Sequence, residues 1–362
     1  MTQRGFARAF EQRGVSSLCV DECVPLNVDL RRILARCPAQ PSVILQPESE
    51  LLLMPWGLAE VDVPTVCFQI DTYAYTRPRI RWSMLFDHPI VFHPGYEEKF
   101  RTAGHPGVFT VFHAVERDVF DKPEETRILD VGFVGKMFAS FQQSRQRVLV
   151  DLSRCFQMND WRRFYSYEEM AQVYRCSKVV VNVARDDFPQ DANMRAFEAM
   201  AAGALLITRV PSELTQIGFK EGTHFIGYED ERTIVDLVGQ YQANERARRR
   251  IAEAAREKVF REHTYDCRVD ALLQMLEENA GKLCAPARGW SEERIRLTYL
   301  DFYSAHFLMG CAHHELRCIA SRSFRSATAG AYFIARARAI QSRGWLMARL
   351  PGVQSRASAG IS

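Results

Sequence analysis

Short apolar runs alternate with polar, helix-like stretches from Pro41 to Tyr228. The runs are rich in β-branched and aromatic residues, as buried strands are. Strands that alternate with helices indicate parallel sheets with helical crossovers, so the pattern predicts an α/β fold. The expected strands lie within residues 42–46, 65–70, 89–93, 108–113, 127–136, 178–184, 204–208 and 224–228.

The strands fall into two series, which indicates two βα domains in tandem. A chain of 362 residues suits two domains, because single cores stop growing at about 250–300 residues. We place the domains at residues 1–126 and 127–281, followed by a helical extension at 282–362. Within the extension, residues 282–290 have the composition of a linker, and 291–320 are periodic enough for one long helix.

The composition is that of a globular protein, with 47% hydrophobic and 25% charged residues. No apolar stretch approaches the ~18–20 residues that span a bilayer, and the first residues do not resemble a signal peptide, so we expect a cytoplasmic protein. The ten cysteines lack the spacing of a disulfide framework. Cys311, His314 and Cys318 would share a helical face that suits a metal ion, but core packing explains this spacing equally well, and we expect no metal site.

The stretch 192–208, ANMRAFEAMAAGALLIT, keeps two opposite charges in a run of small and apolar residues. Asn193 is placed to cap a helix over 194–202, and Gly203 to end it with a positive φ. Arg195 and Glu198 then lie on one face of that helix. One interpretation is a surface ion pair, worth only about 0.3–0.5 kcal/mol.

The position of this helix favours a ligand site instead. In open α/β sheets ligands bind beyond the carboxyl ends of strands, and the helix follows the expected strand at 178–184. Its first-turn N–H groups and Arg195 suit phosphate oxygens, while Glu198 suits two neighbouring hydroxyls such as those of ribose. Phosphate and ribose together indicate a nucleotide.

Several motifs occur in the order typical of one enzyme family: FVGK (133–136), YRCSKVVVNVARDD (174–187), NMRAFEAMAAGALLIT (193–208) and REHTYDCRVDALL (261–273). With them the chain resembles, over roughly residues 41–275, the CgeB-like branch of the group-1 glycosyltransferases, the spore-maturation-protein type. The resemblance implies the GT-B fold, in which two Rossmann-like domains face a cleft. It also implies a nucleotide-sugar donor as co-substrate of the 127–281 domain, an acceptor bound by the 1–126 domain, and no metal or other cofactor.

The resemblance further implies roles for residues of the donor site. Glu198 would bind the donor ribose, and Arg195 would lie near the diphosphate together with the turn at Gly135 and Lys136. Asn182 and Arg185 match family positions close to the cleft. Asn193, the expected cap at the same end of the helix, completes this group.

Glycosyl transfer needs a base for the acceptor hydroxyl. Asp71 is the first candidate, because the strand before it ends at the cleft in the family, and His88 is the second. Each has a structural alternative, since an Asp after a strand often caps a turn and a His before Pro often makes a local hydrogen bond.

One position departs from the family. Many group-1 enzymes have a second glutamate, which meets the donor sugar, where this chain has Gln190, and an amide cannot stabilise positive charge at the anomeric carbon as a carboxylate does. From the resemblance as a whole we expect a metal-independent glycosyltransferase that acts on a saccharide, lipid-linked glycan, protein or small molecule. The alternatives are a non-catalytic nucleotide-sugar-binding or partner-assembling protein and a sugar-nucleotide epimerase, against which Gln190 argues.

The last 47 residues hold eight arginines and no Asp or Glu. Their apolar residues are not segregated from the arginines, so we expect a helical cap on the domains or on a second subunit. Peripheral contact with the inner face of a membrane is the alternative. Nucleic acid is not an expected partner, because no known reading module occurs.

Overall fold

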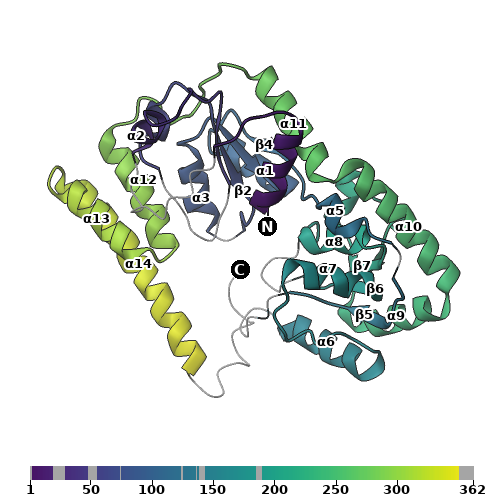
Figure 1. Cartoon of the computed structure of the whole chain (residues 1–362). Coiled ribbons are helices and arrows are strands. Elements are labelled where there is room, and N and C mark those ends of the chain that lie inside the picture. Colours follow the sequence, from purple (N-terminus) through teal and green to yellow (C-terminus); the bar gives the residue numbers. More distant parts are fainter. Residues whose placement is uncertain are drawn as a thin grey trace. The chain divides into compact units, whose positions relative to one another are not determined.

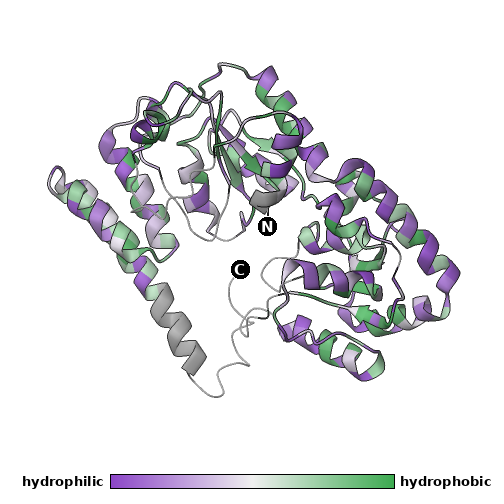
Figure 2. Cartoon of the chain, viewed as in Figure 1, coloured by the Kyte–Doolittle hydropathy of each residue, from purple (hydrophilic) through white to green (hydrophobic). Residues whose placement is uncertain are grey.

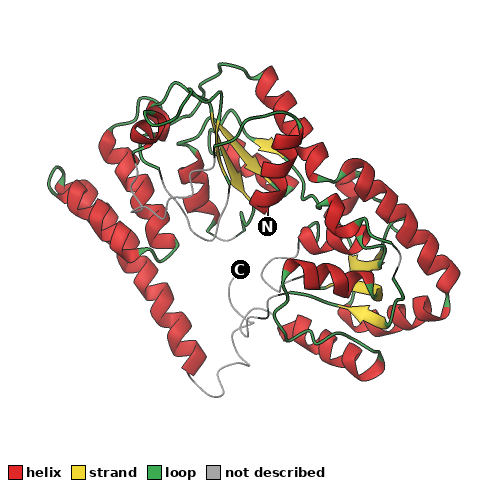
Figure 3. Ribbon diagram, viewed as in Figure 1, coloured by secondary structure: helices red, strands yellow, loops and turns green. Residues whose placement is uncertain are grey.

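The computed structural model describes residues 2–18, 29–47, 55–73, 75–123, 125–135, 137, 143–184 and 190–349. It divides into two compact units: unit 1 comprises Met1–Val20 and Val111–Asn279, and unit 2 comprises Asp21–Thr110 and Ala280–Ser362. The ranges predicted from the sequence differ at both ends of the chain, because each terminal segment belongs with the unit that is more distant in sequence. The eight expected strands are all present, in two parallel sheets (Figures 1 and 3).

The sheet of unit 1 has the order β5-β6-β7-β8, all parallel. Its strands are Leu129–Gly132, Ser177–Asn182, Leu205–Arg209 and Ile226–Tyr228. Side chains alternate between its two faces: Val180 of β6 joins one core cluster, whereas Val179 and Val181 join the other. A sheet buried on both faces explains the continuous apolar runs in the sequence.

Helices cover both faces of this sheet. One core cluster takes residues from α7 (Tyr167–Arg175), α8 (Met194–Ala201) and α10 (Glu245–Glu262). The other takes residues from α6 (Gln143–Cys155) and α9 (Ile234–Ala243). Among the described residues of unit 1, the remaining α-helices are α1 (Thr2–Gln12), α5 (Arg117–Phe120) and α11 (Tyr265–Glu278). This doubly wound arrangement is the Rossmann-like organisation predicted for the second series of strands.

The first helix packs within unit 1. Arg13 follows α1, and its guanidinium donates to Asp266 Oδ1 (2.8 Å) and Asp270 Oδ2 (2.7 Å) of α11. Phe6 packs edge-on against Tyr265, with 5.1 Å between ring centroids. These contacts explain why the start of the chain belongs to unit 1.

The sheet of unit 2 has the order β1-β2-β3-β4, also parallel. Its strands are Ile44–Gln46, Thr65–Gln69, His88–Val91 and Phe109–Thr110. Between them lie α3 (Thr76–Ser83) and α4 (Pro94–Thr102), and α2 (Leu30–Leu34) precedes β1.

The C-terminal extension completes the core of unit 2. It forms α12 (Glu292–Ala305), α13 (Met309–Ala320) and α14 (Phe324–Arg349). Tyr299 of α12 is 1% exposed and packs against Trp82 of α3, with 5.2 Å between ring centroids. Ile334 of α14 belongs to the same core cluster as Tyr299. The expected helical cap is therefore present, and it packs within unit 2.

The prediction of a single long helix over 291–320 is wrong. The helix is interrupted between α12 and α13, where Phe307 adopts a left-handed φ of 59°. The periodicity continues across the break because both helices bury residues in one core cluster. Arg296 of α12 and the buried Glu315 of α13 then form an ion pair at 2.8 Å across the helix pair.

Hydrophobic residues concentrate in the strands, and hydrophilic residues mark the outer sides of the helices (Figure 2). Within the described ranges no helix is both long enough and apolar enough to cross a bilayer. Among the same residues no group of three or more His, Cys, Asp or Glu side chains is arranged to hold a metal ion.

Candidate nucleotide-binding site

The carboxyl ends of β5, β6 and β7 share one edge of the unit 1 sheet, because the three strands are parallel neighbours. Helix α8 starts at this edge. Asn193 caps it as predicted: its backbone is extended and its side chain accepts from the Ala196 N–H. Gly203 ends the helix region with a φ of 70°, as the sequence also predicted.

Arg195 is anchored where β5 and β6 end. Its Nε donates to the Val134 carbonyl (2.9 Å) and its Nη1 to Asn182 Oδ1 (2.9 Å). The guanidinium carbon lies 4.6 Å from the centroid of the Phe133 ring. A Cβ on Gly135 would lie 2.4 Å from Arg195 Nη2, so an alanine there would displace the guanidinium. The guanidinium is thus fixed at the strand ends.

Glu198 lies one turn further along α8 and is only 6% exposed. No described residue donates a hydrogen bond to its carboxylate, and Arg195 forms no ion pair with it. Burial raises the pKa of Glu198 to about 7, and the charge of Arg195 partly opposes the shift. The interpretation as a surface ion pair is therefore wrong. A buried carboxylate without partners has free acceptor capacity for a ligand.

Among the described residues of this unit, four further polar atoms are buried without a hydrogen-bond partner: Trp161 Nε1, the Tyr167 hydroxyl, Gln190 Oε1 and His263 Nε2. Burial and the nearby Glu198 charge both raise the pKa of Tyr167. Buried polar groups in native proteins are nearly always paired, so atoms left unpaired point to a missing ligand or water.

A buried hydrogen-bond network that the sequence did not reveal supports the site. Asp191 accepts from Thr208 Oγ1 (2.9 Å), Ser212 Oγ (2.5 Å) and the Glu213 N–H (2.8 Å). Its own carbonyl accepts from Asn182 Nδ2 (2.8 Å). Burial raises the pKa of Asp191, and its three hydrogen bonds oppose this. The only sequence signal was an acidic residue in a loop between a strand and a helix.

Asn182 links this network to the helix. Its Oδ1 accepts hydrogen bonds from both Arg195 and Asn193 (3.2 Å to Asn193 Nδ2). Its Nδ2 donates to the Asp191 carbonyl and to Thr208 Oγ1. The structure thus brings together Gly135, Asn182, Asn193 and Arg195 at one sheet edge. Glu198 lies on α8, the helix that carries Arg195. Lys136 and Arg185, predicted for the same site, lie outside the described residues.

The two candidate bases belong to unit 2 and lie at opposite ends of its strands. Asp71 follows the carboxyl end of β2 and is exposed. His88 is the first residue of β3, at the amino end of the sheet, and is 1% exposed. Burial lowers its pKa, so the ring is neutral at pH 7. Ligands bind beyond the carboxyl ends of such sheets, which argues against His88 as the base and keeps Asp71.

Residues 135–274 match the family model described as Glycosyl transferase-like. The match covers α8, Glu198 and both flanking strands. Comparison with curated protein sequences gives no match. The chain thus carries a glycosyltransferase domain, which confirms the enzyme class predicted from the motifs.

Solved structures of glycosyltransferases show weak overall similarity to the chain. Sucrose-phosphate synthase from Thermosynechococcus elongatus is 13% identical, with a TM-score of 0.49 over 69% of this chain and 76% of that one. A glycosyltransferase from Rickettsia africae is 8% identical, with a TM-score of 0.49 over 75% and 87%. HepE of Anabaena, in complex with UDP and glucose, is 11% identical, with a TM-score of 0.46 over 59% and 72%. Each score is below 0.5, so the functional assignment rests on the family match and on the site residues.

Proposed function

We propose that the chain transfers a sugar from a nucleotide-sugar donor to a hydroxyl-bearing acceptor, with unit 1 as the donor-binding unit. The observation that carries the proposal is the buried Glu198 carboxylate, which has no hydrogen-bond partner among the described residues and lies on the helix that starts at the carboxyl edge of the sheet. Two adjacent ribose hydroxyls would donate to its two oxygens. This contact selects a nucleoside over a simple phosphate.

The diphosphate of the donor would lie at the amino end of α8. The helix dipole and the remaining N–H groups of Arg195 favour negative charge there. These groups would also stabilise the charge that develops on the departing diphosphate, which supplies electrostatic catalysis without a metal ion. We therefore expect activity to survive a chelator such as EDTA.

Unit 2 is proposed to bind the acceptor, with Asp71 as the base. The measurement that tests this role is kcat and KM of Asp71→Asn once a donor is known. We expect kcat to fall about 10²–10⁴-fold, the range of general base catalysis, while donor binding is unchanged. Asp62→Asn, a change at another acidic residue of unit 2 that is exposed, is the control. An unchanged kcat in Asp71→Asn would exclude the role.

The experiment for the proposed function starts with a panel of nucleotide sugars. A ligand that binds the native state raises the unfolding temperature, so thermal shift identifies the donor. Slow release of nucleoside diphosphate from that donor then demonstrates transferase chemistry with water as acceptor. A chain that no nucleotide sugar stabilises would contradict the proposal.

A non-catalytic nucleotide-sugar-binding protein is the second candidate, and Gln190 favours it. Its amide oxygen is buried without a hydrogen-bond partner among the described residues, and it cannot supply the negative charge that a glutamate would. Stabilisation by a donor without release of nucleoside diphosphate would select this candidate. Gln190→Glu would then be tested for gain of donor hydrolysis.

The finer assignments belong to the same proposal. The run of motifs around Glu198 favours the CgeB-like branch within the group-1 enzymes. A cytoplasmic location, with peripheral contact to a membrane or self-association through the basic C-terminal helices, is the setting that we propose. Sedimentation velocity of the full chain, alone and with anionic vesicles, tests both contacts.

A further inference from the structure

Two described residues other than glycine adopt a left-handed backbone, and they lie against each other in unit 2. They are Tyr75, with a φ of 60°, and Phe307, with a φ of 59°. Their rings meet edge-to-face, with 6.3 Å between centroids. Tyr75 ends the loop between β2 and α3, and Phe307 lies in the turn between α12 and α13. A left-handed backbone is strained in bulky residues, and such strain concentrates at functional sites.

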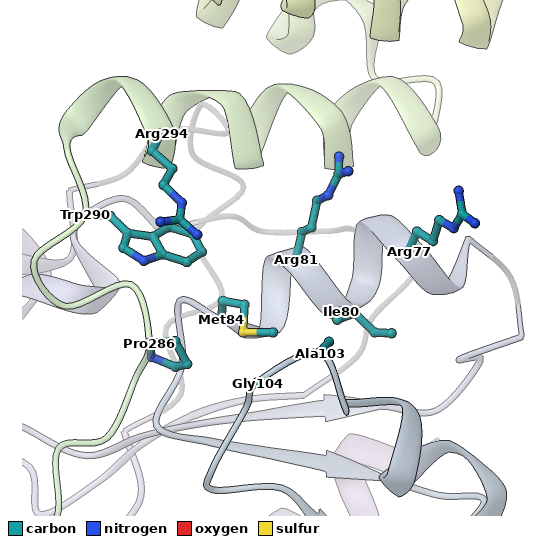
Figure 4. Close-up of a pocket in the computed structure, with 9 residues that line it drawn as sticks. All are labelled: Arg77, Ile80, Arg81, Met84, Ala103, Gly104, Pro286, Trp290 and Arg294. Carbon is teal, nitrogen blue, oxygen red and sulfur yellow. The ribbon is translucent and has the colours of Figure 1, made fainter. Parts of the chain in front are cut away.

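The packing of α12 against α3 brings these two segments together. The helices run in opposite directions: Arg294, near the start of α12, and Met84, directly after α3, line the same pocket (Figure 4). Further along the pair, Asp301 Oδ2 lies 2.7 Å from Arg81 Nη1. The last turn of α12 therefore reaches the start of α3, and the C-terminal extension supplies half of this contact.

The ring of Tyr75 continues a chain of aromatic rings that begins in the core of unit 2. Trp82 lies 5.1 Å from Phe302, which stacks on His306 with 4.0 Å between centroids. His306 in turn lies 5.1 Å from Tyr75. Trp82 and Phe302 are 3% and 1% exposed, whereas Tyr75 is 41% exposed. The chain of rings thus ends in an exposed ring whose position is fixed by contacts with the core.

Each of the two segments also buries a hydroxyl that no described residue satisfies. Thr72, in the loop before α3, is 0% exposed, and Ser304, in the last turn of α12, is 2% exposed. Thr72 Oγ1 and Ser304 Oγ both lack a hydrogen-bond partner among the described residues. Buried hydroxyls are nearly always paired, so both point to a polar ligand or to water in this part of the unit.

We propose that Tyr75 and Phe307 bind the acceptor and that this acceptor is a saccharide. The proposal rests on the proposed function, in which unit 2 binds the acceptor and Asp71 is the base. Tyr75 follows Asp71 by four residues in the same loop, so a sugar ring on Tyr75 would have its hydroxyls near that carboxylate. The face of an aromatic ring is electron-rich, and the C–H groups on the apolar face of a pyranose are slightly positive.

Other classes of acceptor use this surface less fully. A lipid chain would lie beside charge, because the exposed Asp71 and Arg77 flank Tyr75 in the sequence. A simple alcohol would gain nothing from the aromatic rings. A saccharide has both an apolar C–H face for the rings and hydroxyls for the neighbouring polar groups.

Saturation-transfer NMR of the full chain, with no donor present, tests the proposal. The probes are methyl glycosides of hexoses and N-acetylhexosamines, with glycerol as a probe that has hydroxyls but no ring. We expect saturation to reach the ring protons of at least one glycoside and not to reach glycerol. Tyr75→Ala should weaken binding of that glycoside about tenfold, and Tyr75→Phe should retain it, because the ring makes the contact. The control is Tyr332→Ala at a position 62% exposed on α14 of the same unit, which should bind as the wild type does.

The outcomes separate this proposal from the proposed function. Saturation of phenol but of no glycoside would overturn the saccharide in favour of an aromatic acceptor. An equal loss of glycoside binding in Tyr75→Ala and Tyr332→Ala would also overturn it. Glycoside binding that depends on Tyr75, without release of nucleoside diphosphate from any donor, would support this site and reject the transferase. Transfer to a non-sugar alcohol by a chain that binds no glycoside would do the reverse.

Discussion

At the scale of single residues, the proposed donor site depends on Glu198. Its carboxylate is buried on a helix that begins at the sheet edge, and no described side chain satisfies it. A group of this kind costs stability in the absence of ligand, because burial penalises its charged form. That cost is expected at a functional site, where a ligand restores the missing hydrogen bonds.

The raised pKa of Glu198 predicts a pH dependence of stability. Its folded pKa of about 7 exceeds the unfolded value of 4.5, so between these values the folded state binds more protons. The contribution of this group is therefore fully present below pH 4.5 and is lost as the pH rises through 7. The full loss corresponds to about 3 kcal/mol.

Urea unfolding of the wild type and Glu198→Gln at pH 5 and pH 8 measures this loss. The two proteins should have similar stability at pH 5, and the glutamine variant should be more stable at pH 8 by about 3 kcal/mol. The matched control is Glu253→Gln, a change at an exposed position of α10. A stability difference that does not vary with pH would show that the carboxylate is solvated.

At the scale of elements, Gly203 joins α8 to β7 with a left-handed backbone that glycine adopts with the least strain. Its φ is 70°, and an added Cβ would lie 2.9 Å from Arg127 Nη2. That guanidinium donates to the carbonyls of Ser177 (2.6 Å) and Ala202 (3.1 Å) and so ties the end of α8 to β6. The site depends on this junction, because α8 carries both Arg195 and Glu198.

Gly203→Ala should therefore destabilise unit 1 by about 1–2 kcal/mol through backbone strain alone, with an added cost if Arg127 shifts. Gly239→Ala is the control within the same unit. It lies inside α9, where a Cβ would meet only Phe156 at an ordinary 3.9 Å, and should stabilise by up to about 1 kcal/mol. Thermal unfolding of both variants measures these changes in stability. Equal changes in unfolding temperature would contradict the backbone strain expected at position 203.

The elements also show what the sequence could predict. The strands and α8 were predictable because hydrophobic periodicity, caps and a terminal glycine are local signals. The break at Phe307 was not, since the apolar period continues through it and neither Pro nor Gly occurs within the connecting residues 306–308. Asp191 was missed for a different reason: its three partners are 17 to 22 residues away in the chain, and only the fold brings them together.

At the scale of the whole molecule, the chain crosses between units at both ends. The sequence predicted a separate extension at 282–362, because linker composition at 282–290 looks like a boundary. In the structure, Tyr299 of that extension packs on Trp56 and Trp82, and its hydroxyl donates to the Pro55 carbonyl (2.5 Å). Composition does not reveal which core a segment enters.

This assignment predicts a long-range effect of one substitution. Tyr299→Ala should destabilise unit 2 by about 3–5 kcal/mol, the usual cost of removing a large aromatic side chain from a core. Hydrogen exchange should then lose protection in β2 and β3 but keep it in β6 and β7. Tyr332→Ala, at a position 62% exposed on α14, is the control. Protection of β2 and β3 that Tyr299→Ala does not change would mean that the extension is an independent domain.

The binding of the donor ribose by Glu198 is tested most directly by calorimetric titration. The best-stabilising nucleotide sugar is titrated into the wild type, Glu198→Ala and Glu253→Ala. Loss of the carboxylate removes charge-assisted hydrogen bonds to the ribose, so Glu198→Ala should bind about 10–100-fold more weakly. Glu253→Ala should bind as the wild type does. Wild-type affinity in Glu198→Ala would contradict the assignment of this carboxylate to the nucleoside, and with it the proposed donor site.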